Sequence, residues 1–263
     1  MSKTPIHRRI LIVGEGLETE HNYFVGFRHA FGKELQALAT TIDVKRGKGG
    51  DASSIVKHAI NKMKTFAPNR KRGDRVFLVM DTEGHGLAPG CGRAPELPAA
   101  EKLARDNGIE IVYSAPAIEY WLLCHFQNIP RASFANCAAV TVVLDKVKYW
   151  KTVCKSEYDK ADQDVFDRLS HGFDVARKQS LEIDLHHLQT TGAARKTNPS
   201  TQIYELIAIL IGTQAGEKCP IAGTWELIGI TNAEGQPISK AMKKGETMPM
   251  HGENIAHWQL INS

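Results

Sequence analysis

The sequence predicts an α/β fold, with a mainly parallel sheet and helices on both of its faces. Short apolar runs alternate with helical patterns through the first half of the 263-residue chain. The run from Ile10 to Val13 leads through a Gly-Glu-Gly turn directly into a helical pattern. A later run, Val76 to Met80, is too short for a helix and is typical of a strand buried on both faces. This alternation is the pattern of crossover connections between parallel strands.

Local patterns support each element in turn. Asp51 can cap a helix whose apolar face is formed by Val56, Ile60 and Met63. Gly108 ends a later helix, and the apolar run after it forms the next strand. In chain order we expect a strand at 10–13, a helix carrying Tyr23, Phe24, Phe27 and Phe31, a strand at 40–45, a helix after Asp51, a strand at 76–80, a helix at 97–107, a strand at 109–113 and a helix at 117–126.

The chain divides into three expected parts. Residues 1–135 form the α/β domain and residues 136–212 form a helical extension packed on it. In that extension Asn198 is the expected cap of a helix with Pro199 at its first position. Residues 219–263 form a small β-rich module, with strands expected at 225–231 and 257–261.

The C-terminal module resembles a small zinc ribbon, in Gly223-x-Trp225 and Trp258-x-Leu260. The cysteine pairs of such modules are missing, so we expect it to fold without zinc. Across the whole chain five scattered cysteines form no Cys-x-x-Cys pair, which argues against structural zinc and a disulfide framework: Cys91, Cys124, Cys137, Cys154 and Cys219.

Charge and hydropathy narrow the class of protein. The net charge of +4 is modest, so attraction to nucleic acid must come from local patches. The N-terminus has no signal-peptide pattern, and no apolar segment approaches the length of a membrane span. We expect a cytoplasmic protein with no membrane partner.

Glu15 lies in the turn where nucleotide-binding folds hold a phosphate. A dinucleotide fingerprint needs glycine at the position of Thr19, and a P-loop needs Gly-Lys-Ser/Thr. Both are missing, so no nucleotide cofactor is expected. A carboxylate in this turn is compatible with a phosphate only when a divalent metal or a proton lies between them.

Asp81 and Glu83 follow the strand at 76–80. If strand geometry continues through Glu83, the two side chains point to the same side. If this strand is a neighbour of the first, both acids meet Glu15 at the carboxyl edge of the sheet, where open α/β sheets bind ligands. Carboxylates without a nearby thiolate suit Mg²⁺ or Mn²⁺ as cofactor rather than zinc.

Four motifs occur in order over about residues 8 to 212: Glu15-Gly16-x-x-Thr19-Glu20-x-x-Tyr23-Phe24, Asp81-x-Glu83, Ala115-Pro116-x-x-Glu119-x-Trp121-Leu122-Leu123-x-His125-Phe126, and Asn198-Pro199-x-Thr201. Together they resemble the RloB-like branch of the TOPRIM-fold proteins. The resemblance implies a TOPRIM-like sheet, Glu15 as general acid/base, Asp81 and Glu83 as Mg²⁺ ligands, and phosphodiester chemistry on DNA or RNA. It also implies a role in bacterial antiphage defence. The family usually has Asp-x-Asp where this chain has Asp81-x-Glu83, and glutamate also binds Mg²⁺.

Two further acids have open interpretations. Glu20 either orients Glu15 or a metal-bound water, or stabilises the first turn of its helix. Glu119 lies in a strongly apolar helix, so it is either turned to solvent or paired at the site.

Basic residues near strand and helix ends are candidates for substrate phosphate contact. The first group borders a glycine-rich turn: Lys45, Arg46 and Lys48. The alternative is that these residues lie in an ordinary solvated turn without any substrate contact. The second group precedes the expected helix at 199 and otherwise serves only for capping: Arg195, Lys196 and Asn198.

Three functions remain open on the sequence. The leading hypothesis is a Mg²⁺-dependent TOPRIM-type nuclease in antiphage defence, with an ATPase or another defence-system subunit as a candidate partner. The second is a noncatalytic nucleic-acid-binding or regulatory subunit of a defence complex. The third keeps the metal site but uses it as a small-nucleotide phosphodiesterase or nucleotidyltransferase.

Overall fold

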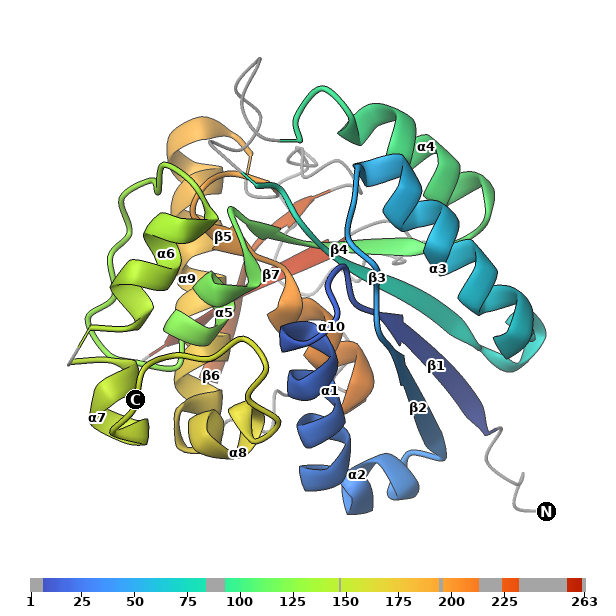
Figure 1. The fold of residues 1–263 in the computed structure, drawn as a ribbon, viewed down its shortest axis with the longest axis horizontal. Helices are drawn as coiled ribbons and strands as arrows, with labels where there is room; N and C mark the ends of the chain where they lie inside the picture. Colours follow the sequence, from blue (N-terminus) through green and yellow to red (C-terminus); the bar gives the residue numbers. More distant parts are fainter. Residues whose placement is uncertain are drawn as a thin grey trace.

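The computed structural model describes residues 7–83, 93–146, 148–193, 196–212, 224–231 and 255–261. Its centre is a five-stranded sheet in the order β2-β1-β3-β4-β5 (Figure 1). The strands are β1 (Arg8–Val13), β2 (Thr40–Lys45), β3 (Arg75–Asp81), β4 (Glu110–Ala115) and β5 (Ser200–Thr201). The first four are parallel and β5 runs antiparallel to β4. The predicted α/β class is confirmed, and the arrangement is consistent with a TOPRIM-like sheet.

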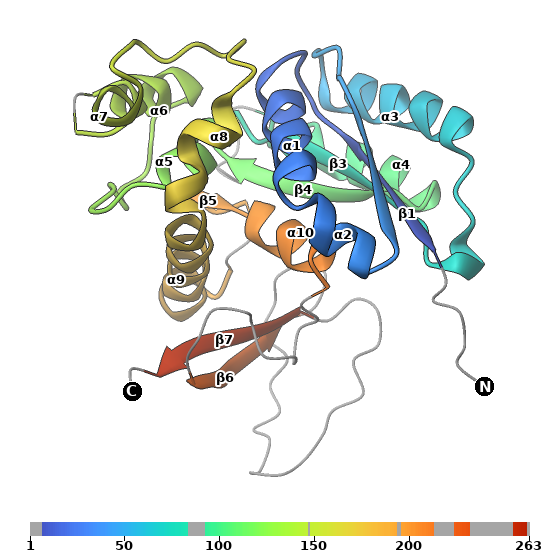
Figure 2. The ribbon, with the colours of Figure 1, turned by 90° about the horizontal axis from the view of Figure 1, so that it is seen from below.

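Alternate residues of β1 and β3 enter two separate cores, because successive side chains of a strand point to opposite faces. Ile10 and Ile12 pack with one set of helices, whereas Leu11 and Val13 pack with another. Figure 2 shows α1, α2 and α10 on one side of the sheet and α3 and α4 on the other. These helices and α5 are α1 (Thr19–Ala30), α2 (Gly32–Ala37), α3 (Ala52–Phe66), α4 (Leu97–Asp106), α5 (Ile118–Leu123) and α10 (Ile203–Leu210).

The helical extension shares the α1 side of the core. Phe166 and Phe173 pack on Phe27 with ring centroids 5.9 and 6.0 Å away. Its helices are α6 (Cys137–Leu144), α7 (Trp150–Cys154), α8 (Val165–Leu169) and α9 (Phe173–Thr191). Short 3₁₀ helices lie at η1 (Arg70–Arg72) and η2 (Ser170–Gly172). Within the described ranges no helix combines the length and apolar character that a membrane span needs.

The two strands predicted near the C-terminus are present. They are β6 (Thr224–Thr231) and β7 (Ile255–Ile261), which form an antiparallel pair. Strand β7 contacts α9 of the helical extension. Residues 213–223 and the whole segment between the two strands, residues 232–254, lie outside the described residues.

The chain around Asn198 differs from the prediction. Pro199 does not begin a helix: it follows a cis peptide bond and leads into β5, and α10 begins at Ile203. The side chain of Asn198 does not cap a helix, because its two ends bond the backbone N–H and C=O of Phe134. The residues after Pro199 instead pair with the free edge of β4, so this end of the helical extension completes the sheet.

The backbone after β3 also differs from the prediction. Strand β3 ends at Asp81, and Glu83 has φ 54°, in the left-handed region. The strand geometry therefore does not continue through Glu83. The amide of Glu83 instead bonds the carbonyl of Pro116 in the loop after β4.

Candidate functional site

Four acidic residues gather at the carboxyl edge of the parallel strands. Glu15 follows β1 and Asp81 is the last residue of β3. Glu20 lies in the first turn of α1, and Glu119 lies in the first turn of α5, after β4. The strands are parallel neighbours, so their connections to helices begin at the same edge, as the sequence predicted for Glu15 and Asp81.

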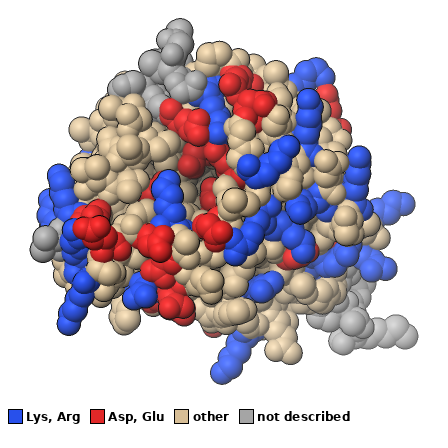
Figure 3. Space-filling model, in the orientation of Figure 1, with Lys and Arg blue, Asp and Glu red and all other residues tan. Residues whose placement is uncertain are grey.

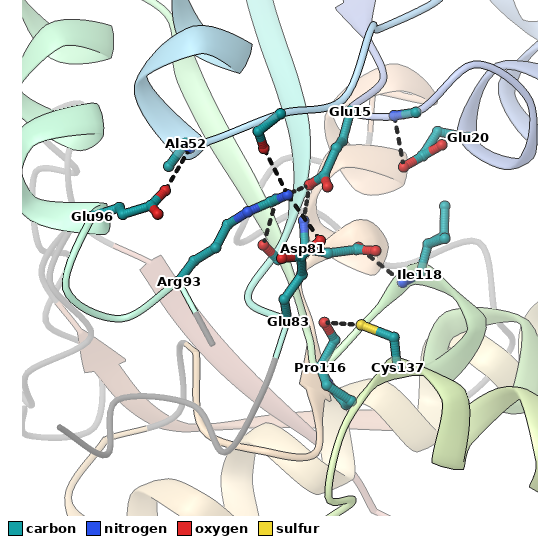
Figure 4. A network of polar contacts seen from close by, with 12 residues as sticks. Glu15, Glu20, Ala52, Asp81, Glu83, Arg93, Glu96, Pro116, Ile118 and Cys137 are labelled. Atoms are coloured by element: carbon teal, nitrogen blue, oxygen red, sulfur yellow. Dashed lines mark hydrogen bonds and ion pairs between the residues drawn. The ribbon is translucent and has the colours of Figure 1, made fainter. Parts of the chain in front are cut away.

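Hydrogen bonds from backbone amides hold the carboxylates of Glu15 and Asp81 in place (Figure 4). Glu15 Oε2 accepts from the amide of Asp81 at 2.9 Å. Asp81 Oδ1 accepts from the amide of Ile118, the first residue of α5, also at 2.9 Å. Glu15 thus joins the end of β1 to the end of β3, and Asp81 joins the end of β3 to the start of α5, so the sheet sets the positions of both side chains.

Arg93 is the principal cation of this cluster. Its guanidinium lies 2.5 Å from Glu15 Oε2 and 2.9 Å from Glu83 Oε1. It also donates to the carbonyl oxygens of Asp81 and Gly50. Glu83 therefore reaches the site through Arg93, rather than by pointing alongside Asp81 from a continued strand.

The glycine-rich turn at 47–50 is part of the site for a reason the sequence analysis did not identify. The amides of Gly47 and Gly49 donate to the carbonyls of Gly16 and Glu15, at 2.8 and 3.0 Å. A Cβ on Gly47 would lie 1.9 Å from the carbonyl oxygen of Glu15. Glycine is therefore required there because two backbones meet, so the turn fixes the loop that carries Glu15.

Glu20 and Glu119 are nearly fully buried beside these residues. Glu20 Oε1 accepts weakly from the amide of Gly16 at 3.4 Å. Glu119 Oε1 pairs with Lys160 Nζ at 2.9 Å and lies 3.5 Å from the hydroxyl of Tyr158. Glu119 is thus paired at the site rather than turned to solvent, and its proposed support of catalysis stays a prediction, as does that of Glu20.

The cluster holds more negative charge than its buried cations balance. Loss of water on burial raises the pKa of Glu20 to about 7 and raises that of Glu15, although Arg93 opposes the rise at Glu15. Burial first, and then the neighbouring carboxylates, raise the pKa of Asp81 well above its ordinary value. An additional positive charge at this point would relieve the repulsion.

The oxygen donors suit a hard divalent cation, but the side chains are not arranged as a finished metal centre. Among the described residues no group of three His, Cys, Asp or Glu side chains is placed to hold a metal ion. Arg93 pairs with both Glu15 and Glu83 and so lies between these two carboxylates. Glu15 Oε1 and Asp81 Oδ2 accept no hydrogen bond from the described residues, so these two atoms are the available donors. Metal binding by Glu15, Asp81 and Glu83 stays a prediction.

Cys137 lies beside the acids but is not a candidate nucleophile. Its thiol donates to the carbonyl of Pro116 at 3.5 Å. Burial, and then the charge of Asp81, raise its pKa to about 12. Without a metal the thiol therefore stays protonated at neutral pH and is a poor nucleophile.

The basic residues of the 45–48 turn differ in whether they form ion pairs. Lys45 pairs with Asp43 at 3.1 Å, and Arg46 pairs with Glu18 at 2.5 Å. Lys48 is exposed and has no ion pair with a described residue. It stands between the two glycines that contact the Glu15 loop. Figure 3 shows acidic side chains in a hollow of this face with Lys and Arg side chains around it.

The contacts of the second basic group are with other parts of the chain. Lys196 pairs with Glu101 and lies over the ring of Tyr113 at 5.1 Å. Asn198 uses its amide on Phe134. Arg195 lies outside the described residues. Phosphate contact by this group stays a prediction.

Sequence reasoning missed Arg93, Tyr158 and Lys160. A signal existed for Arg93, since it is the only Lys or Arg between Arg75 and Lys102, and clustered carboxylates need a counter-ion. Nothing comparable marked Tyr158 or Lys160, which lie in a polar loop far along the chain.

Comparison with known proteins gives one family match. The profile of one protein family, described as RloB-like protein, matches residues 10–210, which include every acid of the cluster. Searches of curated proteins and of solved structures give no significant match.

Proposed function

The chain belongs to the RloB-like family, and we propose that it is a Mg²⁺-dependent nuclease that hydrolyses phosphodiester bonds of DNA or RNA. The observation that carries the proposal is the hydrogen bond from the Asp81 amide to Glu15, which unites two strand ends in one acidic cluster. The raised pKa of Asp81 supports a cation at this point.

In this proposal Glu15 and Asp81 hold the ion through oxygen atoms that accept no hydrogen bond from the described residues. A bound Mg²⁺ supplies a Lewis acid that polarises the phosphate and activates water. Glu83 is the third proposed ligand, and it pairs with Arg93 through Oε1.

Glu15 is the proposed general acid/base. In the metal-free chain burial raises the pKa of its carboxyl although Arg93 opposes the rise, and a bound cation would oppose it further. Its contacts with the Asp81 amide and Arg93 fix the side chain, so a proton is moved at a defined position. Arg93 and the exposed Lys48 supply positive charge near the phosphate.

The test is cleavage of labelled DNA and RNA, single- and double-stranded, in Mg²⁺, Mn²⁺ or EDTA. We expect metal-dependent cleavage by the native chain and none by Glu15→Gln or Asp81→Asn. Glu34→Gln is the matched control, because Glu34 is exposed on α2. Circular dichroism checks the fold of each variant. Cleavage by Glu15→Gln at the native rate would refute the proposed role of Glu15.

A noncatalytic role in binding nucleic acid is the second candidate, and Arg93 favours it. The guanidinium already pairs with both Glu15 and Glu83, as in a purely structural ion-pair network. This candidate predicts binding of nucleic acid without cleavage in any metal, and no effect of Glu15→Gln on that binding.

We also propose a role in antiphage defence, with an ATPase or another defence subunit as partner. Family membership supports this setting. Phage plating on cells that carry the whole locus tests it: Glu15→Gln should abolish protection and Glu34→Gln should not. Full protection by Glu15→Gln would separate the defence role from the acidic site.

A further inference from the structure

A loop of the helical extension, residues 155–164, is attached to the N-terminal part of α1. Asn22 Nδ2 donates to the carbonyls of Ala161 and Asp162, each at 3.2 Å. Thr19 Oγ1 donates to the carbonyl of Lys160 at 3.1 Å. Asn22 and Thr19 are both buried, so these bonds hold the loop backbone firmly against the helix that follows Glu15.

This attachment puts Lys160 beside the acidic site. Its Nζ is 2.9 Å from Glu119 Oε1. The Lys160 side chain is 63% exposed, whereas that of Glu119 is 2% exposed. Lys160 therefore extends from solvent to a buried carboxylate, and its ammonium can reach a ligand outside without any movement of the backbone.

Tyr158 supports the same arrangement. Its hydroxyl lies 3.4 Å from Thr19 Oγ1 and 3.5 Å from Glu119 Oε1. The tyrosine ring packs against Trp150 of α7, and this contact fixes the position of the hydroxyl. The loop thereby brings one cation and one hydroxyl to Glu119.

The two cations of the site differ in their freedom. Arg93 has a 6% exposed side chain and contacts two carboxylates and two carbonyls, so it is committed to the protein. Lys160 has one ion-pair partner within the described residues, three donors and a flexible stem. An incoming phosphate can share or replace Glu119 as its partner.

We infer that Lys160 binds a phosphate of the nucleic-acid substrate, so that the 155–164 loop forms one side of the substrate groove. The turn at 45–51 lies on the other side of the N-terminal end of α1 (Figures 1 and 2). Lys160 and Lys48 then contact the backbone on the two sides of the acids. This inference rests on the proposed function.

The experiment measures binding of fluorescein-labelled single- and double-stranded DNA and RNA by anisotropy in EDTA, over a range of KCl concentrations. The variants are Lys160→Gln and Lys160→Arg. Lys155→Gln is the control, because Lys155 is an exposed lysine of the same loop without an ion pair to a described residue. We expect Lys160→Gln to weaken binding roughly three- to tenfold and to reduce the salt slope by about 0.7 on single strands or 0.9 on duplexes. Lys160→Arg should retain both, and Lys155→Gln should match the native chain.

Glu119→Gln separates substrate contact from a purely structural ion pair. It releases Lys160 from its carboxylate, so binding should stay equal or become tighter if Lys160 contacts phosphate. If Lys160 only neutralises Glu119, Lys160→Gln lowers the melting temperature but leaves the salt slope unchanged, and the inference is overturned while nucleic-acid binding stands. If the native chain binds none of the probes, the inference falls together with the proposed nucleic-acid substrate.

Discussion

Arg93 and Glu15 form a buried ion pair, 2.5 Å between guanidinium and carboxylate, at the carboxyl edge of the sheet. The two residues are 78 positions apart and come from different connections, so only the fold joins them. The ion pair explains how the carboxylate of Glu15, a residue that is only 8% exposed, can lie beside Asp81. It also makes Arg93 a competitor of any cation that Glu15 and Glu83 would bind together.

We predict that Arg93→Ala destabilises the metal-free protein by about 3 kcal/mol. The substitution leaves the buried Glu15 unpaired and removes contacts with the carbonyls of Asp81 and Gly50. Arg93→Lys should lose less, because it keeps the charge but not the planar fork. Urea unfolding in EDTA measures the difference.

The control for Arg93 is Arg105→Ala, since Arg105 is exposed on α4. Its free energy of unfolding should stay within about 0.5 kcal/mol of the native value. An Arg93→Ala protein as stable as this control would show that the pair with Glu15 contributes nothing net.

Asp81→Asn should stabilise the metal-free chain, on the order of 1 kcal/mol, and abolish its response to Mg²⁺. Asparagine still accepts from the Ile118 amide, and it replaces a carboxyl whose ionised form is disfavoured by burial and by the neighbouring carboxylates. For the native chain, Mg²⁺ at ten times its Kd should add about 1.4 kcal/mol. Thermal melting with and without Mg²⁺ checks both effects. An equal rise in melting temperature for both proteins would remove Asp81 from the metal site.

Gly47→Ala should destabilise the site by several kcal/mol, because the added Cβ would lie 1.9 Å from the Glu15 carbonyl oxygen. The turn must move away, so the bond from the Gly47 amide to Gly16 breaks and Glu15 loses its support. Gly32→Ala is the control, since a Cβ there meets nothing within 4 Å. Hydrogen exchange of the Gly47 and Gly49 amides should rise in Gly47→Ala only. Native protection of these amides in that variant would contradict the close approach.

His125 should make the protein lose stability as pH falls from 6.5 towards 4. Burial lowers the pKa of this imidazole from 6.5 to about 4, and the neutral ring bonds the Trp121 carbonyl and the Tyr23 hydroxyl. The unfolded chain therefore binds more protons in this window, so its protonation favours unfolding. The stability that the neutral ring contributes above pH 6.5 is lost as pH falls, by about 3 kcal/mol in total.

The measurement is the free energy of unfolding as a function of pH for the native chain and His125→Gln. Between pH 6.5 and 4, the slope of the unfolding free energy against pH should be smaller for the variant by up to about 1.4 kcal/mol per pH unit. His171→Gln is the exposed control and should keep the native slope. Identical slopes for His125→Gln and the native chain would show that the buried histidine is not the titrating group.

The strands and most helices could be predicted because their determinants are local. Apolar runs such as Val76 to Met80 can be buried only between two layers of helices, and Asp51 caps its helix through its own neighbour, Ser54. Glu15 and Asp81 were predicted to meet because parallel strands end at a common edge. The prediction was wrong at Asn198 and Glu83, because a distant segment provides the hydrogen-bond partner of each. The backbone of Phe134 bonds the side chain of Asn198, and the Pro116 carbonyl accepts from the amide of Glu83.

The sequence by itself predicted the four parallel strands, the helices on both faces of the sheet, and two acids at the carboxyl ends of those strands. The tertiary structure alone decided which cations balance them. Arg93 reaches Glu15 from the connection before α4, and Lys160 reaches Glu119 from a loop that Asn22 and Thr19 hold. Hydrophobic periodicity and turn preferences depend on residues close together in the chain, so the local sequence predicts them. The pairing of buried charges depends on which distant segments fold against each other, and no local pattern records it.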